Sequence, residues 1–268
     1  MSLRPLTSRR RHTYYFLRTI RGFSPVFLDT DVDMTRVQDV RGAAAQSGRR
    51  YSAVAVTILA AARALAAHPR ANAALHGGLR PRIESYDGVD VKVALDKNLD
   101  GERVVLSAVL RDAHVSDLDG IQEQLAHYRA GDATTMPEFA PVRRLHRLPA
   151  WLGSPLFART VRPPAGRRRL MGTLAVSSLG HRPVNGFHSV GGTTITLGLG
   201  RITDQPVVRD GRVVVAPVMR LNLAFDHRVV DGAEAADLLA DIKAALENFQ
   251  LPVVHGADDH RLPLGGRR

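Results

Sequence analysis

The sequence predicts an α/β fold, an α+β two-layer sandwich built on a mixed sheet. Strand and helix patterns follow one another along the 268 residues without strict alternation, which argues against a doubly wound parallel sheet. The length permits one large domain or two small ones, with volume for a sizeable core. With 44% hydrophobic and 24% charged residues, the composition is that of a globular protein.

Each predicted element follows from a local pattern. Val26 to Asp33 alternates apolar and polar residues, as a half-buried strand does. Ser52 to Ala67 is apolar nearly all round, which predicts a buried helix ended by Pro69. Further helices are predicted over Thr35–Ser47, Ser116–Ala130 and Ala233–Phe249. Further strands are predicted over Arg82–Tyr86, Val89–Leu95, Arg103–Leu110, Gly172–Ser178, Thr193–Gly200, Val213–Ala216 and Met219–Phe225.

The two ends of the chain depart from this pattern. Residues 1–25 indicate a basic N-terminal arm, in which Ser8 could cap a short helix that runs to Arg21. Residues 251–268 form a polar tail that contains proline and glycine. We therefore expect an arm at 1–25, a domain at 26–250 and a tail at 251–268.

Charge and cysteine content exclude several classes of site. The chain has 37 Lys+Arg against 26 Asp+Glu, and arginine supplies nearly all of the excess of +11. Such a bias often reflects a GC-rich genome, and no nucleic-acid-binding motif accompanies it, so we expect no nucleic-acid partner. The absence of cysteine excludes disulfides, thiolate metal sites and a cysteine nucleophile.

No segment indicates export or membrane insertion. The basic segment Met1–Arg11 is not followed by an apolar stretch with a small-residue cleavage site. The longest apolar run, Val54–Ala67, is too short to span a bilayer and contains Arg63. We expect a cytoplasmic protein with no transmembrane segment and no bound metal.

The residues best suited to chemistry lie between the last predicted strand and the last predicted helix, in the octapeptide Asp-His-Arg-Val-Val-Asp-Gly-Ala at 226–233. His227 can transfer protons near neutral pH, Asp231 can reach back to fix the turn, and Gly232 permits a tight backbone. The residues alone leave an alternative open, in which Asp231 caps the helix and His227 is an ordinary polar residue.

This octapeptide resembles the His-x-x-x-Asp-Gly signature of the acyltransferase subunits of 2-oxoacid dehydrogenase complexes. That family belongs with chloramphenicol acetyltransferase to a superfamily of coenzyme A-dependent acyltransferases. Four more segments resemble the family in the same order: a first strand and helix start at 29–35, a long buried helix at 52–72, a hairpin at 82–94 and a Val-Ser-Ser-Leu-Gly turn at 176–180. The resemblance implies the chloramphenicol acetyltransferase-like fold.

The resemblance also implies a mechanism. His227 would be the general base that takes the proton from a thiol as its sulfur attacks a thioester carbonyl, in a direct transfer through a ternary complex. Ser177 would donate a hydrogen bond to the tetrahedral oxyanion. Ser178 lies beside it and could hold that position instead.

Three supporting roles follow from the same resemblance. Asp231 would orient the catalytic histidine, paired with an arginine of the N-terminal arm, either Arg9 or Arg10. Ser178 and Arg228 are candidates for binding substrate. Coenzyme A or acyl-coenzyme A would be a substrate.

The family also implies an assembly, because its members form trimers in which the histidine of one subunit faces the serine of its neighbour. The chain has a single His-x-x-x-Asp-Gly motif, so we expect a homotrimer with a closed interface. Larger cages in the family use hydrophobic C-terminal contacts. The polar tail therefore favours isolated trimers.

The sequence departs from the family pattern at its beginning, where it has no room for lipoyl and subunit-binding domains. We expect no covalent lipoyl group in this chain. This predicts a stand-alone acyltransferase, and such an enzyme fits a specialised biosynthetic pathway. An acyl carrier or a lipoyl protein would then act in trans. Two alternatives stay open: a conventional dihydrolipoamide acyltransferase core served by a separate lipoyl protein, and a non-catalytic trimeric scaffold.

Three departures lie inside the domain. Residues 99–105 replace the family's Pro-Gly-Leu stretch, and Ala224 stands where a serine is usual. A basic insertion at 143–169 holds eight arginines among apolar side chains, and no acidic residue occurs from Phe139 to Thr203. This insertion is either a solvated loop or a docking surface for an acidic or phosphate-bearing partner.

Overall fold

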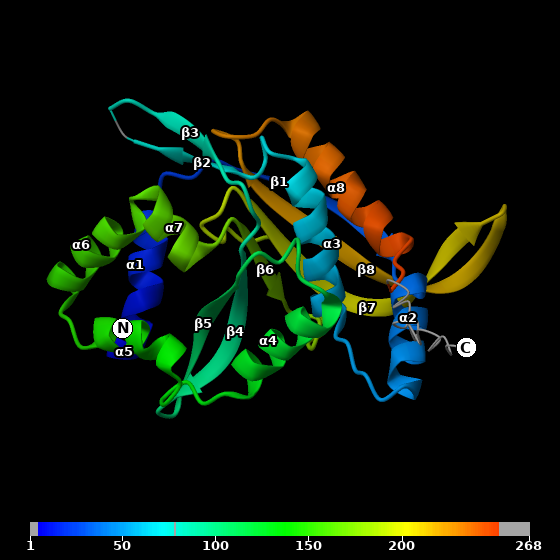
Figure 1. The fold of residues 1–268 in the computed structure, drawn as a ribbon, viewed down its shortest axis with the longest axis horizontal. Helices are drawn as coiled ribbons and strands as arrows, with labels where there is room; N and C mark the ends of the chain where they lie inside the picture. The colour runs from blue at the N-terminus through cyan, green and yellow to red at the C-terminus, as the bar shows by residue number, and fades with distance from the viewer. Residues whose placement is uncertain (1–4, 78, 252–268) are drawn as a thin grey trace, which may run out of the picture.

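The computed structural model describes residues 5–77 and 79–251, so the predicted tail lies outside the described residues apart from Leu251. A six-stranded sheet runs through the middle of the molecule (Figure 1), in the order β1-β8-β7-β6-β4-β5. Its strands are β1 (Pro25–Asp33), β4 (Val91–Leu99), β5 (Glu102–Leu110), β6 (Leu174–Ser178), β7 (Ile195–Arg209) and β8 (Arg212–Asp226). β6 runs parallel to both β4 and β7, whereas the other neighbours are antiparallel. The predicted mixed sheet is confirmed.

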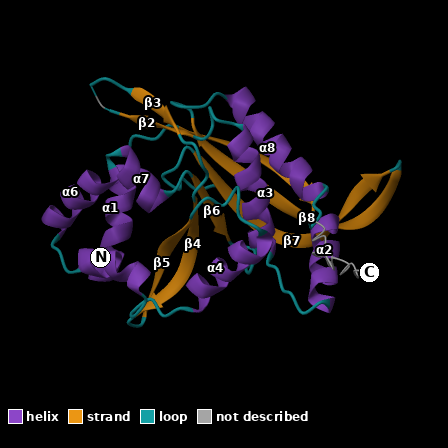
Figure 2. Ribbon diagram, in the orientation of Figure 1, coloured by secondary structure: helices purple, strands orange, loops and turns teal. Residues whose placement is uncertain are grey.

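The main core lies between this sheet and a layer of helices (Figure 2). The layer consists of α2 (Thr35–Gln46), α3 (Ala53–Ala67), α4 (Leu118–Ala130) and α8 (Gly232–Glu247). Ser52 caps α3, because its hydroxyl accepts a hydrogen bond from the Ala55 N–H at 3.1 Å. Nine of the fifteen residues of α3 are buried, as its apolar sequence predicts.

A second group of helices gathers beside β5 and holds the N-terminal segment (Figure 1). Its members are the short helix η1 (Ser8–Arg10), α1 (Arg11–Thr19), η2 (Pro137–Phe139), α5 (Ala140–His146), α6 (Ala150–Val161) and α7 (Pro164–Met171). Tyr15 is buried against Gly153, where an added Cβ would lie 2.6 Å from the tyrosine hydroxyl. The arm thus packs on the predicted insertion, and Ser8 lies inside η1 rather than at its cap.

Two strand predictions are corrected by the pairing. The segment at 82–94 does not form a hairpin, because β3 (Arg82–Ser85) pairs with β2 (Ala73–His76) in a separate two-stranded sheet. The strands predicted at 213–216 and 219–225 are one strand, β8, which continues through Pro217. The Pro217 carbonyl accepts from the Met34 N–H at 2.8 Å. Pro217 thus lies opposite the end of β1, so the N–H that proline lacks removes no hydrogen bond between strands.

The β7–β8 hairpin extends beyond the rest of the sheet (Figure 1). Before Val218, β8 pairs only with β7, and the hairpin turns at Asp210 and Gly211, which both have positive φ. Val208, Val213 and Val215 near its tip are exposed. Among the described residues, no helix is both long and apolar enough to cross a membrane.

Candidate functional site

A buried ion pair shapes the turn that carries His227. Asp226 is 2% exposed, and its carboxylate accepts hydrogen bonds from Arg228 Nε at 2.8 Å and Nη2 at 2.5 Å. The Ser24 N–H approaches Asp226 Oδ1 at 3.4 Å. Burial alone would raise the pKa of Asp226, but the Arg228 guanidinium and the backbone N–H groups hold it below its usual range. The turn is therefore braced from inside.

His227 extends outward from this braced turn. Its backbone N–H donates to the Ser24 carbonyl at 2.9 Å. Its ring is 46% exposed, with Nδ1 lying 3.7 Å from Asp231 Oδ1. Asp231 occupies the N-cap position of α8 but its side chain makes no capping hydrogen bond. Its carboxylate, 92% exposed, lies on the Nδ1 side of the imidazole.

Ser177 and Ser178 lie near the end of β6 and line a cavity of about 340 Å³. Neighbouring residues of a strand point to opposite faces of the sheet. Val176 faces the core, and Ser178, two residues later, lies on the same face of β6. Ser177 lies between them and points to the opposite face. The Ser178 hydroxyl accepts from the Gly180 N–H at 3.4 Å, whereas the Ser177 side chain makes no hydrogen bond within the described residues.

The structure does not bring Ser177 and His227 together within one chain. Ser177 is in register with Gly198, and Gly198 is in register with Asn222, five residues before His227. Five residues at about 3.3 Å each and two strand spacings of about 4.8 Å separate the two backbones by roughly 15–20 Å. One thioester cannot contact both side chains of the same copy.

The arm arginines are also placed away from Asp231 in the isolated chain. Arg9 pairs with Asp100, at 3.3 Å between Nη2 and Oδ2. Arg10 lines the same cavity as Ser177. Arg228, a candidate for substrate binding, pairs through its guanidinium with Asp226 and stacks over Phe23 at 5.1 Å.

The arginine-rich insertion is helical, and part of its charge is consumed inside the protein. Arg168 Nε lies 2.9 Å from the buried Asp90 carboxylate. Arg143 donates to the carbonyls of Ala133 and Met136, and Arg167 donates to the Gly192 carbonyl. The five remaining arginines of the insertion, at 144, 147, 159, 162 and 169, are exposed.

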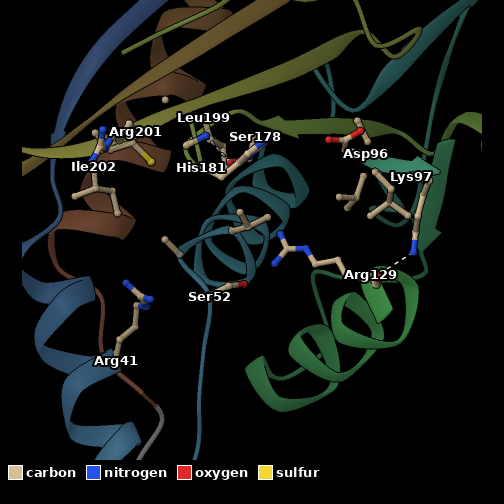
Figure 3. A pocket seen from close by; sticks show the side chains of 18 residues that line it. Arg41, Ser52, Asp96, Lys97, Arg129, Ser178, His181, Leu199, Arg201 and Ile202 are labelled. Atoms are coloured by element: carbon tan, nitrogen blue, oxygen red, sulfur yellow. Dashed lines mark hydrogen bonds between the residues drawn. The ribbon is translucent and has the colours of Figure 1, made fainter. Parts of the chain in front are cut away.

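Sequence analysis missed a second, larger cavity of about 690 Å³ next to Ser178 (Figure 3). Its basic lining comes from Arg41, Lys97, Arg129 and Arg201. These residues belong to four different elements, α2, β4, α4 and β7. No sequence motif links them, because only the fold brings them together.

Comparison with known proteins supports the resemblance. The sequence profile of the 2-oxoacid dehydrogenases acyltransferase catalytic domain matches residues 170–254. The dihydrolipoyllysine-residue acetyltransferase component of the pyruvate dehydrogenase complex of Staphylococcus aureus is 47% identical over 60 residues. That match covers 22% of this chain and only 14% of the relative.

Solved structures of the same family share the fold. The dihydrolipoamide acetyltransferase of Azotobacter vinelandii aligns with a TM-score of 0.68 at 21% identity, over 92% of each chain. A truncated catalytic core of the 2-oxoacid dehydrogenase complex of Thermoplasma acidophilum aligns with a TM-score of 0.62 at 18% identity, over 92% of this chain and 98% of that one. The predicted fold class is therefore confirmed.

Proposed function

We propose that the chain, whose residues 170–254 match the 2-oxoacid dehydrogenase acyltransferase family, moves an acyl group from a thioester to a thiol by direct attack. The observation that carries the proposal is the braced turn, which holds a half-exposed His227 with its Nδ1 toward the Asp231 carboxylate. A carboxylate on that side favours the proton on Nδ1 and leaves Nε2 to accept a proton from a thiol.

The spacing of the candidate residues supports their roles. The Azotobacter vinelandii enzyme was investigated for the catalytic role of a serine, a histidine 52 positions later and an asparagine four positions after that. In this chain Ser177 precedes His227 by 50 positions and Asp231 follows it by four. Ser177 rather than Ser178 is the better match, and aspartate replaces the asparagine.

The reaction balances without a covalent enzyme intermediate. His227 takes the thiol proton as the sulfur attacks the thioester carbonyl, and the Ser177 hydroxyl donates a hydrogen bond to the oxyanion. Collapse of the tetrahedral intermediate breaks the original carbon–sulfur bond, and the leaving thiolate takes the proton from the imidazolium. General-base help contributes roughly 10²–10⁴-fold, and one oxyanion donor about 3 kcal/mol.

A complete site then requires two copies of the chain, since Ser177 and His227 of one copy lie too far apart. His227 of one subunit would meet Ser177 of the next, which is a heterologous contact that must close into a ring. We propose the homotrimer expected for the family. The exposed valines of the projecting β7–β8 hairpin support a protein contact there.

Coenzyme A is proposed as one thiol partner, and a lipoyl group or an acyl carrier borne elsewhere as the other. The similarity to a dihydrolipoyllysine-residue acetyltransferase favours the lipoyl thiol. A scaffold without catalysis is the second candidate function. It predicts no turnover with any thiol.

The direct test measures acetyl transfer from acetyl-coenzyme A to dihydrolipoamide and to other thiols. His227→Ala should lower kcat by roughly 10²–10⁴-fold. His127→Ala, which removes an exposed histidine bonded to Glu138, is the matched control and should keep wild-type activity. Equal activity of His227→Ala and wild type would show that the base is misassigned.

A further inference from the structure

The helix α6 leaves one of its faces exposed. At about 100° per residue, the exposed side chains of this face fall within an arc of about 140°, whereas the buried Gly153 and Val161 lie outside it. The α6 face consists of Trp151, Leu152, Pro155, Leu156, Arg159 and Arg162. Trp151 is 78% exposed. A cluster of large apolar side chains so open to water marks a site of interaction.

The α6 face is a fixed feature of the fold. On the opposite side of the helix, Gly153 lies against the buried Tyr15 of α1. Just before the helix, Arg11 donates to the carbonyls of His146 at 3.0 Å and Leu148 at 2.7 Å. These contacts hold both the helix and the link that leads into it, so the α6 face is presented in one orientation.

Apolar and basic side chains occupy different parts of the α6 face. Trp151, Leu152 and Leu156 lie toward the N-terminal end of the helix, and Arg159 and Arg162 lie at its C-terminal end. Leucine and tryptophan beside arginine is the composition of helices that lie in the plane of a membrane surface. Tryptophan in particular favours the boundary between lipid and water. With 12 residues, α6 is too short to cross a bilayer.

The two arginines of the α6 face are not neutralised within the described residues. In that part of the chain, the ion pairs of the 143–169 insertion are those of Arg168, and neither Arg159 nor Arg162 forms one. α1 and α7 pack against α6, and neither of these helices contains an acidic residue. The α6 face is therefore complementary to an anionic surface.

Two observations favour a lipid surface over an acidic protein. No residue of the α6 face lines either of the cavities described above, and α6 lies at the outer edge of the molecule (Figure 1). A partner helix is typically seated in a groove, whereas a bilayer accepts a protruding face. The net charge of +11 also attracts the whole chain to an extended anionic surface. A nucleic acid would leave the apolar side chains in water.

We propose that the α6 face binds the surface of an anionic phospholipid bilayer. Its three large apolar side chains enter the boundary between headgroups and acyl chains, about 5–10 Å deep. Its two arginines contact lipid phosphates, whose oxygens match the guanidinium fork. The inference is independent of the proposed acyl transfer, because no residue of the α6 face lines a cavity or belongs to the His227 turn.

Trp151 is the only tryptophan in the chain, so its fluorescence reports directly on the α6 face. The probe is a vesicle of equal parts phosphatidylglycerol and phosphatidylcholine, added to the full chain. Trp151 emission should move to shorter wavelength as the ring leaves water, and vesicles of phosphatidylcholine alone should have little effect. No shift with the anionic vesicles, or an equal shift with the neutral ones, overturns the proposal.

Sedimentation with the same vesicles tests the arginines. The double variant Arg159→Gln/Arg162→Gln should bind about 25-fold more weakly, at about 5-fold for each charge near the surface. Arg36→Gln/Arg63→Gln is the matched control, because it removes the same net charge from exposed positions of α2 and α3. Equal losses in the two variants would show that only the overall charge matters, and would overturn the α6 face as the binding site.

The apolar part of the face needs a variant of its own. Leu152→Ser/Leu156→Ser should weaken vesicle binding at least 10-fold, while Val115→Ser, at another exposed position, should bind as wild type does. Both leucines are exposed, so the leucine variant should keep the wild-type melting temperature, which shows that it is folded. Wild-type binding by the leucine variant overturns the insertion of these side chains.

Other occupants of the α6 face predict different results. If a second copy of the chain covers the face, Trp151 is protected from acrylamide quenching before any vesicle is added. If an acidic protein binds there, polyglutamate should shift the Trp151 emission as far as the anionic vesicles do. Either result overturns the lipid assignment. Quenching of Trp151 in the free chain, with a shift specific to anionic vesicles, supports it.

Discussion

Asp226 and Arg228 form a two-point ion pair across the residue between them, and that residue is His227. The pair joins Arg228 Nε and Nη2 to the two carboxylate oxygens of an aspartate that is 2% exposed. The catalytic candidate is therefore held at the apex of a turn whose two flanking side chains are locked together. We therefore expect Asp226 and Arg228 to act on the reaction by positioning His227.

Removing the buried carboxylate should loosen the turn. Asp226→Asn leaves Arg228 partly buried without its partner, which should lower the free energy of unfolding by about 3 kcal/mol. Urea unfolding measures that loss. The control is Asp100→Asn, which breaks the exposed Arg9 pair and should cost about 0.5 kcal/mol. Similar losses in the two variants would contradict the bracing role.

Ser177 and Ser178 should differ in their kinetic effects. Ser177→Ala removes the proposed oxyanion donor, so kcat should fall roughly 10²–10³-fold with little change in KM. Ser178→Ala should keep kcat within about 10-fold, because the Ser178 hydroxyl accepts from the Gly180 N–H and points to the opposite face of β6 from Ser177. A larger loss of kcat in Ser178→Ala than in Ser177→Ala would show that Ser178, not Ser177, is the oxyanion donor.

Acid should destabilise the contact between the arm and α5. His146 is buried, with Nε2 lying 2.7 Å from His12 Nδ1. The His12 Nε2–H donates to the Val105 carbonyl, so His12 Nδ1 accepts from His146. Burial, then repulsion from His12 when that ring is also protonated, and the charges of Arg11 and Arg9 lower the pKa of His146 to about 4, with Glu102 opposing them.

The sign of the pH effect follows from that lowered pKa. The unfolded chain binds the His146 proton near pH 6.5, and the folded chain near pH 4. The contribution to stability is complete above about pH 6.5 and falls by about 2–3 kcal/mol as the pH drops toward 4. Urea unfolding at several pH values should show a weaker dependence in His146→Gln, whose amide can still donate to His12. Identical dependence in both proteins would contradict this origin.

The projecting hairpin should contribute to assembly. Val213→Glu places a charge among the exposed valines near its tip, so the trimer should dissociate at concentrations where wild type stays assembled. Light scattering measures the mass. Val115→Glu, at an exposed position between β5 and α4 that lines neither cavity, is the control. A wild-type mass for Val213→Glu would place the interface elsewhere.

Much of the fold could be predicted because burial patterns are local. The alternation in Val26–Asp33 and the apolar run in Ser52–Ala67 each carry their own signal, and the structure confirms both elements. The β2–β3 pairing could not be predicted, since strands of four residues give too little periodicity. Pro217 led us to predict two strands where the structure has one, β8. Because Pro217 lies beyond the end of β1, its missing N–H removes no hydrogen bond from the sheet.

The candidate site divides in the same way. His227 and Asp231 lie in one short motif, so its resemblance to a family signature was enough to propose both as site residues. Arg41, Arg129 and Arg201 are spread along the chain and meet only through the packing of α2 and α4 beside β7. The excess of arginine did not predict which arginines are free to bind a ligand, because some of them, such as Arg168 with Asp90, form ion pairs inside the protein.

The central claim is that each active site combines His227 of one subunit with Ser177 of its neighbour, and mixed trimers test it most directly. Ser177→Ala and His227→Ala chains are each nearly inactive alone and are co-expressed in equal amounts. Random closed trimers of the two should regenerate about a quarter of the wild-type sites, and activity should recover to about that level. Mixed trimers that stay as inactive as the separate variants would contradict a shared site.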